Sequence, residues 1–88
     1  LMANYRLVVK RSVAKDLRQI PNKDVMRILQ CIETLRESLR PMGSEKLSGQ
    51  ERYRIRQGVY RIIYEVKDEH LIVTVVKVGH RKQVYTRS

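Results

Sequence analysis

The chain has 88 residues, of which 42% are hydrophobic and 32% are charged, and this fits one small domain spanning residues 1–88. Its 19 Lys and Arg residues exceed its 9 Asp and Glu residues to give a formal net charge of +10. Folding does not require this surplus, which favours a polyanionic partner. No apolar run approaches the roughly 20 residues of a membrane-spanning helix, and no secretory leader is recognisable, so a cytoplasmic protein without a membrane partner is expected.

The first half of the chain predicts one strand and then two helices. Residues 4–10 alternate between apolar and polar side chains, as a half-buried strand does. Ser12 can cap a short helix that ends at Pro21. Asn22 can cap a second helix, whose apolar residues recur at helical spacing until Pro41.

The second half predicts a loop and then three strands. Residues 42–51 contain Gly and Ser without periodicity, which is typical of a loop. Three segments then alternate and are separated by short turns: 52–56, 59–66 and 71–78. The predicted fold class is therefore α+β: a strand, a two-helix hairpin and a three-stranded antiparallel meander, with the helices packed on one sheet face. The other face is left to water or a ligand.

Arginines accumulate on that second face. Alternation in the first strand of the meander places Arg52, Arg54 and Arg56 together, opposite apolar neighbours. Arg61 lies in the next strand, and Arg81 follows the last one. One interpretation is a charged surface that prevents edge-to-edge aggregation. The other is an anion site, because guanidinium groups match phosphate oxygens with two parallel hydrogen bonds.

Several single residues are candidates for either a functional or a structural role. Gly79 follows a β-branched run and marks either a sharp functional turn or the simple end of a strand. Tyr85 lies in a polar segment and can stack on a base or bind a ribose or phosphate. Cys31 lies at the edge of a helical apolar stripe and is expected to be a buried structural thiol. Core positions are expected for three other tyrosines: Tyr53, Tyr60 and Tyr64.

The common catalytic constellations are missing from the sequence. Two His residues and one Cys, without an acidic cluster, match neither a metal site nor a catalytic triad. No glycine-rich phosphate loop precedes a helix. Neither a metal nor a cofactor is expected.

Ordered stretches along almost the whole chain closely resemble one family, the RelE family of bacterial and archaeal toxins. They are Val13-Ala14-Lys15-Asp16-Leu17, Lys46-Leu47-Ser48-Gly49, the run from Tyr53 to Val66, and Val78-Gly79-His80-Arg81-Lys82-Gln83-Val84-Tyr85. The resemblance implies a ribosome-dependent mRNA endoribonuclease that cuts codons in the A site without a metal. It also implies inhibition by a RelB-like antitoxin within a higher-order toxin–antitoxin complex.

The resemblance also implies the chemistry and part of the site. A ribose 2′-oxygen would attack the adjacent phosphate and leave a 2′,3′-cyclic phosphate and a 5′-hydroxyl. Such a reaction needs a base, an acid and cations that stabilise the phosphorane. Arg61 and Arg81 match the phosphate-binding arginines of the family, and Tyr85 matches its C-terminal tyrosine.

The chain departs from well-studied relatives at positions linked to proton transfer. Arg54 and Arg56 stand where those relatives have lysines. Deprotonating an arginine at pH 7 costs about 7.5 kcal/mol, so both are interpreted as electrostatic clamps. Arg52 and Lys82 are further candidates for binding RNA phosphates. His80 becomes a candidate proton carrier, because an imidazole ordinarily changes charge near neutral pH.

Two alternatives stay open at this point. ParE-type toxins share the fold and act on DNA gyrase, and a fold does not determine a function. A basic nucleic-acid binder without catalysis also fits the net charge of +10.

Overall fold

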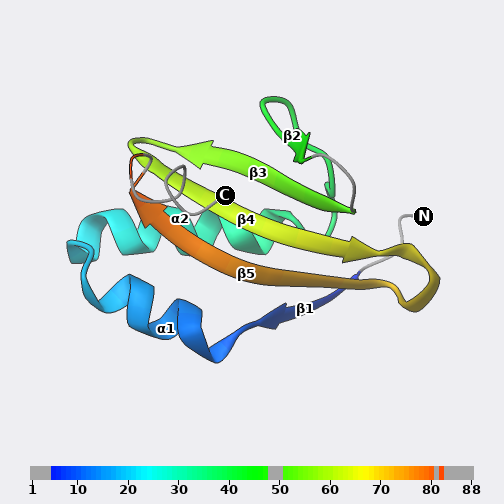
Figure 1. Ribbon diagram of the computed structural model, residues 1–88, viewed down its shortest axis with the longest axis horizontal. Helices are drawn as coiled ribbons and strands as arrows, with labels where there is room; N and C mark the ends of the chain where they lie inside the picture. The colour runs from blue at the N-terminus through cyan, green and yellow to red at the C-terminus, as the bar shows by residue number, and fades with distance from the viewer. Residues whose placement is uncertain (1–4, 48–50, 81, 83–88) are drawn as a thin grey trace.

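The computed structural model describes residues 5–47, 51–80 and 82. Two helices cover one face of a five-stranded mixed sheet (Figure 1), which confirms the predicted α+β class with both helices on one face. In chain order the elements are β1 Arg6–Val9, α1 Arg11–Arg18, α2 Asn22–Thr34, β2 Glu45–Leu47, β3 Arg52–Gln57, β4 Tyr60–Lys67, the 3₁₀ turn η1 Asp68–His70 and β5 Ile72–His80.

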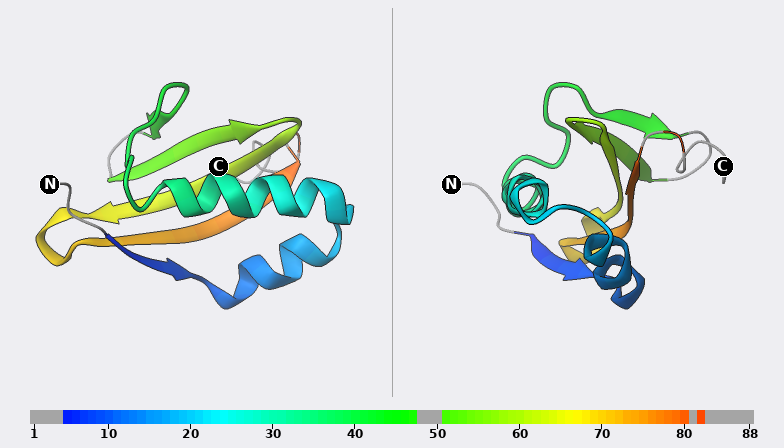
Figure 2. Two further views of the ribbon diagram at one scale, coloured as in Figure 1. Left: turned by 180° about the vertical axis from the view of Figure 1, so that it is seen from behind. Right: turned by 90° about the vertical axis from the view of Figure 1, so that its left-hand side faces the viewer.

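The strand order in the sheet is β1-β5-β4-β3-β2. The predicted meander is present, with β3 antiparallel to β4 and β4 antiparallel to β5. The first strand runs parallel to β5 at one edge, and the helical hairpin carries the chain from β1 to β2 at the opposite edge. Figure 2 shows α1 and α2 on the same side of the sheet.

The core lies between the helices and the sheet. Its buried side chains are Val13, Ile28, Ile32, Leu35, Tyr53, Ile55, Ile62, Tyr64, Val66, Val73, Val75 and Val78. Tyr53 and Tyr64 stack with 5.6 Å between ring centroids, which confirms their predicted core positions, and Tyr60 packs partly buried against the same core. Cys31 is half-buried, and burial raises the pKa of its thiol.

The predicted helix boundaries need correction. Ser12 and Asn22 are not caps: α1 begins at Arg11 after Lys10, and α2 begins at Asn22 after Pro21, neither with a side-chain cap. The carbonyl oxygen of Pro21 instead accepts the first backbone bonds of α2. The second helix ends at Thr34, well before Pro41. The apolar sequence pattern continues beyond Thr34 because the turn that follows the helix still buries Leu35.

The segment 42–51 is not entirely a loop. Its residues Glu45–Leu47 form β2, which pairs antiparallel with β3. Pairing satisfies backbone groups that an exposed strand edge leaves open. Three residues with only one apolar side chain are too short a pattern for sequence periodicity to reveal.

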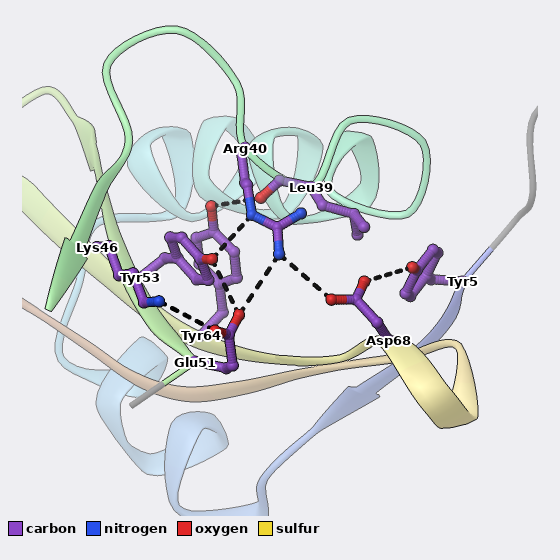
Figure 3. A network of polar contacts seen from close by, with 8 residues as sticks. All are labelled: Tyr5, Leu39, Arg40, Lys46, Glu51, Tyr53, Tyr64 and Asp68. Atoms are coloured by element: carbon purple, nitrogen blue, oxygen red, sulfur yellow. Dashed lines mark hydrogen bonds and ion pairs between the residues drawn. The ribbon is translucent and has the colours of Figure 1, made fainter. Parts of the chain in front are cut away.

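Polar contacts around Arg40 join segments far apart in the chain (Figure 3). Its guanidinium lies 5.0 Å from the ring centroid of Tyr53 and donates to the Tyr53 hydroxyl at 2.8 Å. It also donates to Glu51 at 3.5 Å and to Asp68 at 3.4 Å. Lys46 donates to Glu51 at 3.0 Å. The network thus joins the segment after α2 to β2, β3 and the turn between β4 and β5.

Acid should weaken this network through Asp68. The Tyr5 hydroxyl donates to Asp68 at 2.6 Å, and this bond, with the charge of Arg40, lowers the pKa of Asp68. A carboxylate with a lowered folded pKa stabilises the fold above its unfolded value of about 3.9 and loses that effect as the pH falls through the folded pKa. We expect Asp68→Asn to lower the melting temperature at neutral pH, with the gap from wild type closing towards about pH 2. Glu69→Gln, which lies outside the network, should not lower the melting temperature. If Asp68→Asn still melted below wild type in acid, ionised Asp68 would not be the stabilising group.

None of the helices in the described ranges combines the length and the apolar composition that crossing a membrane requires.

Candidate functional site

The sheet face opposite the helices carries the arginines that alternation predicts. Tyr53 and Ile55 of β3 are buried in the core. Because successive strand residues point to opposite faces, Arg52, Arg54 and Arg56 lie together on the second face. We call this the arginine face, and it includes the residues of β4 and β5 that share it.

Arg61 is the buried member of this face. It lies in β4 next to the core residue Ile62 and therefore points away from the helices. Only 5% of Arg61 is exposed, whereas the sequence suggested a surface arginine. Its register partners are Arg56 on β3 and Gly79 on β5.

Two of the other arginines are neutralised by glutamates. Arg52 donates to Glu65 from both Nε, at 3.1 Å, and Nη2. Arg54 pairs with Glu45 of β2, and the Arg54 side chain is only 13% exposed. These ion pairs offset part of the repulsion among the arginines of this face. The pairing of Glu45 with Arg54 was not predicted, because Glu45 lies in β2, which the sequence pattern did not indicate.

Two further arginines lie at one end of the arginine face. There, Arg56 is exposed and lies directly opposite Arg61. Like charges directly opposite each other on neighbouring strands repel. The Gly58 turn, with a φ of +63°, joins β3 and β4 at this end.

The structure does not bring His80 together with Arg61. His80 pairs with Tyr60, and their rings meet edge to face at 6.1 Å. Tyr60 shares the helix-covered face with Ile62, so His80 points to that side. His80 therefore lies on the face opposite Arg61, and its role as a proton carrier stays a prediction.

A β-bulge explains this difference. Ile63 pairs with Lys77 while Tyr64 pairs with Val75, so Val76 is an extra residue on β5. An extra residue reverses which face the following side chains take. Uninterrupted alternation would instead have placed His80 on the arginine face.

Gly79 is neither a sharp turn nor a residue beyond the strand. It lies within β5, is buried, and stays in register with Arg61. Lys82 is exposed, and its backbone N–H donates to Nδ1 of His80 at 3.3 Å. Arg81 and Tyr85, the other two predicted site residues, lie outside the described residues. Within the described part of the chain, no three or more His, Cys, Asp or Glu residues are grouped so that they could hold a metal ion.

Comparison with protein families gives one match across most of the chain. The model described as "ParE toxin of type II toxin-antitoxin system, parDE" matches residues 7–85. Among curated proteins, toxin RelG of Mycobacterium tuberculosis is 30% identical over 88 residues, covering 94% of this chain and 98% of that protein.

Solved structures agree with this match. The archaeal RelE–RelB complex from Pyrococcus horikoshii superposes with a TM-score of 0.80 at 28% identity, covering 89% of this chain and 96% of that one. The isolated E. coli RelE toxin gives a TM-score of 0.74 at 28% identity, with 94% and 93% covered.

Proposed function

We propose a ribosome-dependent ribonuclease activity for this chain, which belongs to the ParE toxin family of type II toxin–antitoxin systems and is a RelE-type toxin of such a system. The proposed enzyme is a metal-independent endoribonuclease that cuts mRNA in the A site and so stops translation. It would act in the cytoplasm, where its substrate is translated. The observation that carries this proposal is the buried Arg61 guanidinium beside Arg56.

The proposed reaction needs positive charge where these two arginines lie. The ribose 2′-oxygen loses its proton and attacks the adjacent phosphorus, and the bond from phosphorus to the 5′-oxygen breaks. The 5′-oxygen takes a proton, which leaves a 2′,3′-cyclic phosphate and a 5′-hydroxyl. Negative charge accumulates on the phosphorane oxygens in between, and preorganised cations in a water-poor site stabilise it strongly. The buried Arg61 is suited to this role, and the exposed Arg56 can reach the same phosphate.

The remaining residues take supporting roles in the proposal. Arg81 and Tyr85 are assigned to the phosphate and to the 2′-hydroxyl or base on the strength of the resemblance alone. Lys82 would contact the RNA backbone. Arg52 and Arg54 would be weaker phosphate ligands than Arg56, because they form ion pairs with Glu65 and Glu45. His80 faces away from Arg61, so the proposal assigns it no proton transfer.

A RelB-like antitoxin is the proposed inhibitor, within a higher-order toxin–antitoxin complex. RelE–RelB complexes of Pyrococcus horikoshii and Methanococcus jannaschii are structural relatives of this chain. A chain with a net charge of +10 would attract an acidic partner over a long range, and salt would slow that association.

A second candidate function is inhibition of DNA gyrase. It is favoured by one finding, since the matching family model is named after the ParE toxin. The buried Arg61 favours the ribonuclease instead, because inhibition of gyrase requires no stabilisation of a phosphorane.

Cleavage in a purified translation system tests the proposal. We expect primer extension on translated mRNA to show cuts within codons, with cyclic phosphate ends, and a RelB-like antitoxin to prevent them. The same RNA without ribosomes should stay largely intact, because ribosomal positioning of the substrate can supply most of the rate. Arrest of DNA replication before translation, with the mRNA intact, would instead indicate gyrase inhibition.

A further inference from the structure

We infer that Gly79 is a positioning residue for the cleavage reaction: its missing side chain leaves the space in which the Arg61 side chain is held. The inference rests on the proposed function for its catalytic consequence. The placement of Arg61 itself is independent of that function and can be measured separately.

The backbone does not explain why residue 79 is glycine. The described glycines with a positive φ are Gly43 and Gly58, where an L side chain would be strained. Gly79 instead pairs within β5 with Arg61, and the strand continues to His80. A strand glycine weakens the sheet and often marks a close approach of other atoms. The requirement for glycine here is therefore one of space.

The register partner of Gly79 on β4 is Arg61. Side chains of directly opposed strand residues share a face, with Cβ atoms about 4.5–5.5 Å apart. Both residues are buried, and Arg61 is only 5% exposed. A side chain at position 79 would therefore point into the space beside Arg61 and push it towards Arg56, its other register partner. Two positive charges would then approach each other.

The bulge at Val76 makes this arrangement possible. Without the extra residue, alternation from Val75 would turn Gly79 towards the helices and His80 towards Arg61. The bulge therefore places the residue without a side chain beside the buried arginine. Re-aiming side chains next to active sites is a common use of bulges.

The test compares Gly79→Ala and Gly79→Val with the control variant Thr74→Val. Thr74 lies on the same face of β5 as Gly79, but its register partner is Glu65. The placement of Arg61 is followed by the NMR signal of its Nε–H, assigned with Arg61→Lys, and by the hydrogen exchange of that signal. Activity is followed as the single-turnover cleavage rate on programmed ribosomes. Thermal unfolding shows whether each variant is folded.

We expect both Gly79 variants to stay folded while the Arg61 Nε–H signal shifts and loses exchange protection. The cleavage rate should fall about tenfold in Gly79→Ala and about 10²-fold in Gly79→Val, since misplacing a catalytic group by about 1 Å has this order of effect. Ribosome affinity should not change. In an Arg61→Met background, Gly79→Ala should have no further effect, because the two residues act as one unit.

The outcomes distinguish a failure of the positioning by Gly79 from a failure of the proposed ribonuclease function. An unchanged Arg61 signal in both Gly79 variants overturns the inference, whatever the activity. A displaced Arg61 with wild-type cleavage overturns its link to the reaction. A displaced Arg61 in a protein whose wild type does not cleave mRNA supports the positioning by Gly79 and refutes the proposed function. The Thr74→Val control should leave both readouts unchanged.

Discussion

Arg61→Met should lower the rate of mRNA cleavage about 10²- to 10³-fold, the usual effect of removing one preorganised contact to a transition-state oxyanion. Methionine retains much of the aliphatic volume at a position that is 5% exposed, while it removes the charge. Arg61→Lys should fall between wild type and Arg61→Met, because lysine keeps the charge without the two-pronged geometry. The measurement is single-turnover cleavage on programmed ribosomes, alongside growth arrest in cells.

Arg52→Met is the matched control for this effect. Arg52 lies on the same face but is paired with Glu65, so its loss should change cleavage only a few-fold, because Glu65 already offsets its charge. Circular dichroism must show that the Arg61 variants are folded, because the burial of Arg61 makes a structural role possible. A folded Arg61→Met protein with wild-type cleavage would contradict the proposed role.

The sheet and its arginine face could be predicted because strand residues alternate. In β3, Tyr53 and Ile55 are buried while the arginines between them face the other side, as the pattern indicates. The second helix was also predictable from its apolar period, although its end was not. Leu35 is fully buried beyond the last helical residue, Thr34, so burial alone does not define a helix end.

What could not be predicted depends on pairing between distant residues. The side to which His80 points follows from a bulge, and a bulge is a property of two strands together. The ion pair of Arg54 depends on Glu45, in a three-residue strand that exists only through its pairing with β3. Arg61 is only 5% exposed, whereas composition alone suggests an exposed arginine.

Truncation of Tyr64, which is fully buried, should cause the largest loss of stability. Its ring stacks on Tyr53 at 5.6 Å, and its hydroxyl donates to the carbonyl oxygen of Leu39 at 2.7 Å. Tyr64→Ala should lose about 3–5 kcal/mol of unfolding free energy, as other aromatic truncations in cores do. At about 0.05–0.15 kcal/mol per residue for natural domains, such a loss would remove more than about a fifth of the stability of this chain.

Tyr64→Phe separates the contribution of the ring from that of the hydroxyl. It keeps the packing but leaves the Leu39 carbonyl without this donor, so it should lose about 1 kcal/mol. Tyr60→Ala, at a partly buried ring on the same strand, should cost less than Tyr64→Ala. Urea unfolding followed by circular dichroism measures all three variants. A loss below about 1 kcal/mol in Tyr64→Ala would mean that the helices are not held to the sheet through this ring.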